Sequence, residues 1–139
     1  SIHCENLLTL YQITRNPHWL EEAEKVFKVV HKHLGAYSPG YTYQVMNLLR
    51  FYDKQAPTFI LSCGDDNEWE VISNKIYQEF IPHKVVILNK GDKELLETLP
   101  YLAEYPPLNN KTTLYLCSQN HCKEPTNDIN KILDQIDRV

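Results

Sequence analysis

One stretch, residues 58–66, constrains the fold of this chain more than any other. It reads Thr-Phe-Ile-Leu-Ser-Cys-Gly-Asp-Asp, which is typical of a buried strand that stops at a glycine and opens onto an acidic loop. A helical stripe follows at 69–80, and a second strand, KVVIL, at 84–88. A strand, a crossover helix and a strand form a right-handed parallel unit in nearly all cases. With a third strand at 113–117, we predict an α/β fold with a small three-stranded parallel sheet of βαβ type.

The first part of the chain, residues 1–55, predicts three helices. Asn16-Pro17 is a helix start, because proline at the first helical position loses no hydrogen bond, and Gly35 is a helix end. Short turns between the helices favour antiparallel packing. We expect these helices to be anchored by Trp19 and Phe27 and to pack on the sheet, or on protein outside this chain. The second segment is then 57–139, and the two segments are expected to form one compact fragment of a larger protein.

Local signals set further expectations for residues 57–139. Asn67 and Glu70 resemble a capping box at the start of the first crossover helix, and Asp92 is expected to cap a short helix that ends at Leu99. A last helix is expected to be capped by Thr126 or Asn127. The apolar stripes predicted to face the core are Trp69, Ile72, Ile76 and Phe80 in the crossover helix and Ile129, Ile132, Leu133 and Ile136 in the last one.

Charge and hydropathy argue against two classes of partner. The 139 residues carry a formal net charge of −4 with scattered basic residues, whereas nucleic-acid binding needs clustered Lys and Arg. No run approaches the roughly 20 apolar residues of a membrane span. The first residues show no signal peptide, and the chain begins without Met inside an expected helix, which suggests an excised fragment. Its compartment is unknown, with a reducing one favoured.

The sharpest local feature is the pair Cys117 and Cys122, which flank a four-residue loop at the end of the third strand. Three interpretations compete: two structural thiols, a disulfide or redox pair, or a metal site with His121. The loop could bring the two Cα atoms within disulfide range, although the spacing differs from thioredoxin-type pairs. The metal site lacks a fourth ligand at a zinc spacing. We expect the two sulfurs to lie close together, as reduced thiols, because cytosolic thiols are kept reduced.

The acidic loop Gly64-Asp65-Asp66 is the second candidate site. It lies where open α/β sheets bind ligands, outside the carboxyl ends of the strands. Its two carboxylates could hold Mg²⁺ through waters, or they could simply form a tight turn that places charge at a helix start. No glycine-rich nucleotide motif follows a strand, and no catalytic set, cofactor or metal can be assigned from spacing.

Five groups of residues together resemble one known family over essentially the whole chain. They are Asn6-Leu7-Leu8-x-Leu10 with Thr14 and Trp19; Asn47-Leu48-Leu49; Ile60-x-x-x-Gly64-Asp65; Phe80-Ile81-Pro82-x-Lys84-Val85-x-Ile87-Leu88; and Leu114-Tyr115-Leu116-Cys117-x-x-x-x-Cys122-x-x-Pro125-x-x-Asp128. The chain is similar, by these markers, to the C-terminal end of the spermatogenesis-associated, thioredoxin-like proteins. It departs from their usual pattern at Cys4, Cys63, His121 and Ile129.

The resemblance implies a larger protein with an N-terminal thioredoxin-like domain and a helical toroid similar to sugar epimerases and six-hairpin glycosidases. Residues 1–55 would end the toroid, and residues 57–139 would be a terminal α/β segment. The preferred hypothesis is a non-catalytic module that binds the rest of its own chain and a possible protein partner, with a family role in germ-cell differentiation. The alternative is part of a carbohydrate-active enzyme, an epimerase, isomerase or glycosidase, with a redox-linked thioredoxin domain.

Overall fold

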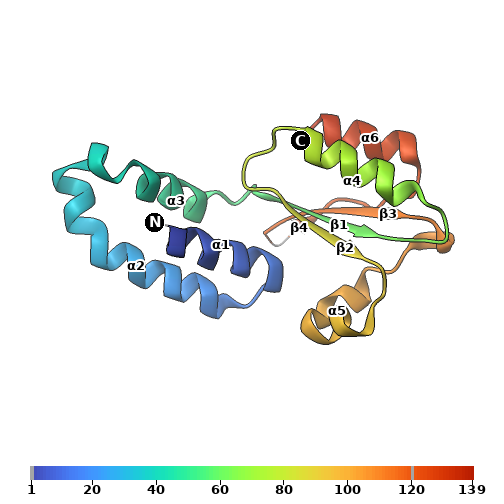
Figure 1. Ribbon diagram of the computed structural model, residues 1–139, viewed down its shortest axis with the longest axis horizontal. Coiled ribbons are helices and arrows are strands. Elements are labelled where there is room, and N and C mark those ends of the chain that lie inside the picture. Colours follow the sequence, from blue (N-terminus) through green and yellow to red (C-terminus); the bar gives the residue numbers. More distant parts are fainter. Residues whose placement is uncertain (1, 120) are drawn as a thin grey trace. The chain divides into compact units, whose positions relative to one another are not determined.

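The computed structural model describes residues 2–119 and 121–139, which form two compact units. The first is helical and ends at Ala56, and the second is the α/β unit Pro57–Val139. Figure 1 shows both, and each is treated by itself below. No helix in the described part of the chain is both long and apolar enough to cross a membrane.

The helical unit consists of α1 (Ile2–Thr14), α2 (Pro17–Ala36), a short 3₁₀ turn η1 (Ser38–Tyr41) and α3 (Thr42–Tyr52). The side chain of Asn16 accepts a hydrogen bond from the His18 N–H at 3.0 Å, so the predicted start of α2 is confirmed. Gly35 does not end α2, which continues for one more residue. Gly35 has no left-handed backbone conformation, the feature with which a glycine usually terminates a helix.

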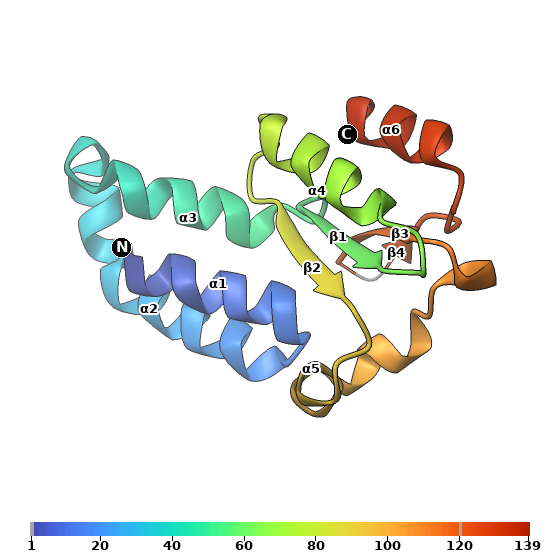
Figure 2. The same ribbon diagram turned by 45° about the vertical axis from the view of Figure 1, so that its right-hand side comes forward.

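The core of the helical unit lies mainly between α1 and α2, which pack side by side, with α3 beside α1 (Figures 1 and 2). Buried side chains from α1 meet Ala23 and Phe27 of α2, and Trp19 packs against them from the edge. The ring of Phe27 meets the ring of Phe51 of α3 edge-on, at 5.3 Å between centroids. Phe27 is therefore an anchor of this unit, as predicted. The buried set is Cys4, Leu7, Leu8, Ala23 and Phe27.

The α/β unit alternates strands and helices along the chain. Its elements are β1 (Pro57–Ser62), α4 (Glu68–Gln78), β2 (Val85–Asn89), α5 (Lys93–Thr98), the 3₁₀ turns η2 (Pro100–Glu104) and η3 (Leu108–Asn110), β3 (Thr113–Ser118), β4 (His121–Cys122) and α6 (Ile129–Asp137). The four strands are ordered β2-β1-β3-β4 in one sheet. The predicted βαβ unit is present, because β1 and β2 pair in parallel with α4 between them in the chain.

The prediction of a three-stranded parallel sheet is wrong in both its size and its direction. The sheet has four strands, and β3 runs antiparallel to β1, with Leu61 opposite Leu114. The connection from β2 explains the reversal. After the carboxyl end of β2 the chain stays at that end of the sheet, where the Asp65 N–H donates to the Asn110 carbonyl at 2.8 Å. Therefore β3 begins beside the end of β1 and must run in the opposite direction.

Strand alternation separates the two faces of the sheet. Phe59 and Leu61 of β1 point toward α4 and α6, which lie together on one face in Figures 1 and 2. The fully buried Ile72 and Ile76 of α4 complete that layer with Ile132 and Ile136 of α6. The alternate residues of β1 point to the opposite face, toward the segment that contains η2. The Ser62 hydroxyl, for example, donates a hydrogen bond to the Tyr105 carbonyl at 2.5 Å.

Four local predictions in this unit are wrong or only partly right. Phe80 is 94% exposed, because α4 ends two residues before it and its place in the stripe is lost; Ile81 packs against the core instead. Asn67 and Asp92 occupy the N-cap positions of α4 and α5, as predicted, but neither side chain makes a capping hydrogen bond. The last helix is capped by Asp128, whose carboxylate accepts from the Asn130 N–H at 2.9 Å.

Candidate functional site

The β3–β4 hairpin joins Cys117 and Cys122 directly across the strand pair. The two residues are register partners with Cα atoms 4.0 Å apart, and their sulfurs form a disulfide. The predicted closeness is confirmed, whereas the expectation of reduced thiols is wrong. That expectation rested on the compartment, and it ignored a pairing register that places the two side chains face to face. In the bonded pair neither sulfur is a thiolate, the form that binds metal, so the site with His121 is not formed.

The two sulfurs have different environments. Cys117 is only 4% exposed within β3, while Cys122 is exposed in β4, the last strand of the sheet. The Tyr105 hydroxyl lies 3.6 Å from the sulfur of Cys122. One sulfur of the disulfide is thus open to solvent, beside a phenol group, and the other is enclosed by the protein.

A tyrosine cluster supports this side of the disulfide. The ring of Tyr105 meets Tyr115 of β3 edge-on at 5.0 Å and Tyr101 of η2 at 6.2 Å, and the Tyr115 hydroxyl donates to the Pro106 carbonyl at 2.6 Å. Burial, with the nearby Tyr105, raises the pKa of Tyr115, so its phenol stays protonated. Tyr105 lies between the predicted helix that ends at Leu99 and the strand predicted at 113–117, so the sequence did not mark it as a site residue. Its position beside Cys122 depends on the antiparallel direction of β3, which the sequence did not predict.

The acidic loop is held by the chain that leads into β3. A Cβ on Gly64 would overlap the backbone of Asn110, so only glycine allows this approach. The carboxylate of Asp66 accepts from the Thr112 N–H at 3.1 Å and from the hydroxyl of the same residue. Asp65 is exposed. In the described chain no three His, Cys, Asp or Glu residues gather as a metal site would require. Asp66 therefore links the acidic loop to the segment that leads into β3 through hydrogen bonds.

A buried polar cluster lies beside this loop, where β1 and β2 end. The Asn89 amide lies 3.4 Å from the Ser62 hydroxyl and the Leu102 carbonyl, which fixes the segment after α5 against the sheet. Burial raises the pKa of the neighbouring Cys63 thiol to about 11, so it is not a nucleophile near neutral pH. Lys90 covers the ring of Trp69, with its ammonium 4.1 Å from the ring centre. These contacts fix the loops in place.

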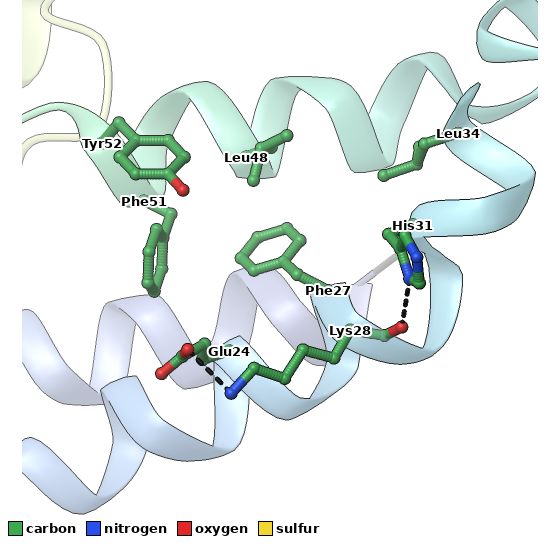
Figure 3. A pocket seen from close by; sticks show the side chains of 8 residues that line it. All are labelled: Glu24, Phe27, Lys28, His31, Leu34, Leu48, Phe51 and Tyr52. Atoms are coloured by element: carbon green, nitrogen blue, oxygen red, sulfur yellow. Dashed lines mark hydrogen bonds and ion pairs between the residues drawn. The ribbon is translucent and has the colours of Figure 1, made fainter.

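The helical unit carries a different kind of feature, an open apolar cavity of about 400 Å³ between α2 and α3. Figure 3 shows Phe27 and Leu34 from α2 facing Leu48, Phe51 and Tyr52 from α3. Its charged edge comes from α2, where Lys28 forms an ion pair with Glu24 at 2.9 Å. We call this cavity the α2–α3 groove. The sequence did not predict this cavity, which among the described residues is lined from α2 and α3 alone.

The groove lies in a unit with many exposed apolar side chains. Leu49 and Tyr52, both on α3, are 68% and 70% exposed. The large exposed apolar residues described in this unit are Ile2, Leu10, Val29, Tyr37, Tyr41, Tyr43, Met46, Leu49 and Tyr52. Contiguous exposed apolar surface on a folded protein usually marks an interface.

Two curated proteins are similar to this chain over nearly its whole length. Spermatogenesis-associated protein 20 of Rattus norvegicus is 24% identical over 144 aligned residues, and that of Mus musculus is 23% identical over 142. In each case 97% of this chain is aligned, but it spans only 18% of the relative's length. No family model and no solved structure matches the chain. The similarity is distant and concerns a small part of a long protein.

Proposed function

We propose that this chain is a non-catalytic structural and interaction module of a larger protein, and that the rest of that protein covers its helical unit. The α2–α3 groove is the observation that carries the proposal. It is lined by apolar side chains from both helices, and a row of exposed apolar residues continues along α3. A side chain moved from water into such a groove gains roughly 1.5–3 kcal/mol. Further helices of the same polypeptide would supply those side chains.

The similarity to longer proteins also supports an occupant from the same polypeptide. The chain aligns with 18% of the length of two spermatogenesis-associated proteins, so a partner segment within one polypeptide is the natural occupant. Because both relatives are spermatogenesis-associated proteins, the proposal includes a role in germ-cell differentiation. The thioredoxin-like domain and the toroid belong to the resemblance, and they are proposed neighbours of this module.

The test compares variants of the exposed apolar residues of α3 in two settings. Leu49→Glu and Tyr52→Glu place a charge on the exposed apolar row, and Val71→Glu, on an exposed apolar side chain of α4, is the matched control. Each is measured by urea unfolding, in residues 1–139 alone and in the full-length polypeptide. We expect the two α3 variants to destabilise only the full-length protein, by about 2 kcal/mol each, because only there is the row buried. Equal effects in both settings would contradict the proposal.

A second measurement addresses the non-catalytic part of the proposal. The full-length protein is screened for sugar turnover and disulfide reduction, with and without residues 57–139. We expect any turnover of sugars to survive the deletion in soluble protein. A variant that stays folded but loses all sugar turnover would instead favour the carbohydrate-active alternative.

A further inference from the structure

The Cys117–Cys122 bond differs from a buried structural disulfide in the exposure of its two ends. The sulfur of Cys122 is on an exposed residue of the outermost strand, and that of Cys117 is enclosed. Exchange of a disulfide requires a thiolate to approach one sulfur along a clear path. Of the two residues only Cys122 is exposed, so a thiolate is expected to reach the bond from its side.

Backbone hydrogen bonds join the two sides of the hairpin in addition to the disulfide. Beyond Cys122 the Lys123 N–H donates to the Leu116 carbonyl at 2.9 Å, and Leu114 and Thr126 exchange two backbone hydrogen bonds, at 2.9 and 3.3 Å. Reduction therefore leaves the two thiols side by side on neighbouring strands. Opening and reclosing of the bond need no unfolding of the strand pair.

The phenol of Tyr105 gives Cys122 a partner in the reduced state. Its hydroxyl, 3.6 Å from that sulfur, can donate a hydrogen bond to a thiolate. A donor to the charged form stabilises it. The same hydroxyl also assists departure of the Cys122 thiolate when a mixed disulfide is resolved. The tyrosine cluster holds the ring in this position.

We propose that Cys117–Cys122 is a thiol–disulfide exchange site for a dithiol partner, with Cys122 as the attacked sulfur and Tyr105 as its positioning residue. A partner thiolate attacks the Cys122 sulfur, the bond to Cys117 breaks, and Cys117 leaves as a thiolate that takes a proton. The partner's second thiolate then attacks its own sulfur in the mixed disulfide and releases Cys122. Two electrons and two protons pass from the dithiol to the pair, and the partner leaves as a disulfide.

The first test uses dithiothreitol as the dithiol on the folded wild-type chain. Protein treated under native conditions is alkylated with iodoacetamide, and each labelled cysteine is identified by peptide mapping. We expect Cys117 and Cys122 to be reduced and labelled with the far-UV circular dichroism unchanged, while the buried Cys4 stays unlabelled. Labelling of the pair only after denaturant is added would overturn the proposal.

The second test assigns the attacked sulfur. Cys117→Ser leaves Cys122 free, Cys122→Ser leaves Cys117 free, and each variant is mixed with oxidised glutathione. We expect the mixed disulfide to form at least about tenfold faster at Cys122, because of its exposure. Should Cys117→Ser not fold, reduced wild type with limiting iodoacetamide must label Cys122 before Cys117. Equal or reversed rates in either format would refute the assignment.

The role of Tyr105 is tested by Tyr105→Phe, with Tyr101→Phe as the control in the same cluster. We expect Tyr105→Phe to slow release of Cys122 from its mixed disulfide, formed with glutathione in the Cys117→Ser background and cleaved by dithiothreitol, about threefold, through loss of one hydrogen bond to sulfur. Tyr101→Phe keeps the edge contact between rings and should leave the rate unchanged. Equal rates for both variants and wild type would remove Tyr105 from the site.

Discussion

In the α/β unit, the central strand β1 is covered on both faces, whereas in the helical unit one side of α3 is left open. All six residues of β1 are buried, between α4 and α6 on one face and the segment after α5 on the other. On α3 only Gln44, Asn47 and Arg50 are buried, and all three are polar. The α/β unit has a closed apolar core, whereas the helical unit exposes apolar side chains.

The buried polar residues of α3 sharpen this contrast. Arg50 donates a hydrogen bond to the Gln12 side chain of α1 at 3.1 Å. The Tyr43 hydroxyl donates to the carboxylate of Glu5, which is also on α1. Polar contacts therefore bind α3 to α1, while its apolar residues line the groove or face outward. A helix arranged in this way suits a position between two layers, and the described residues of the unit form one of those layers.

The largest expected effect is in the closed core. Phe59→Ala should lower the free energy of unfolding of the α/β unit by about 4 kcal/mol, because the ring is fully buried among residues that cannot collapse into its space. Phe80→Ala is the matched control, since that ring is almost fully exposed. Urea unfolding followed through Trp69 measures both. A small loss for Phe59→Ala would show that the core is not closed.

The same truncation in the helical unit should cost less. We expect Phe27→Ala to lower the free energy of unfolding by about 2 kcal/mol, because one side of that ring already borders the open groove. Val29→Ala, on an exposed position of the same helix, should change little. Trp19 fluorescence reports this unit. A loss as large as that of Phe59→Ala would remove the difference between the two units.

The hydrogen bonds between Asp66 and Thr112 should contribute less to the free energy of unfolding than the core of the α/β unit. Asp66→Ala is expected to cost about 2 kcal/mol, because it leaves the Thr112 N–H without its carboxylate acceptor. Asp65→Ala should cost less than ~1 kcal/mol, as an exposed loop charge. Thermal unfolding of both variants gives the ranking. The reverse ranking would point to a cation bound at Asp65.

The smallest effect on stability is expected on the open side of α3. Leu49→Gln in residues 1–139 should change the free energy of unfolding by less than about 0.5 kcal/mol, since the side chain already faces water. It should nevertheless reduce binding of a hydrophobic dye, measured by fluorescence, with Val71→Gln as control. Unchanged dye binding would mean that the exposed row does not form a continuous surface.

The sequence alone determined those features that depend on neighbours in the chain. The βαβ unit followed from apolar runs around a helical stripe, and the start of α2 from Asn16-Pro17, because a cap and a proline act within one turn. The stripe of the last helix, including Ile132 and Ile136, was also predicted correctly. Period and capping are local, so a single sequence is enough to reveal them.

Tertiary structure decided the features that depend on where the chain returns. The direction of β3 was set by the 100–110 segment, which stays at one end of the sheet and passes Gly64 too closely for a Cβ. That reversal brought Tyr105 to Cys122 and Thr112 to Asp66, contacts that span 17 and 46 residues. The disulfide itself needed the hairpin register. Nothing in residue spacing reports such long-range contacts, because the loop that makes them has no period of its own.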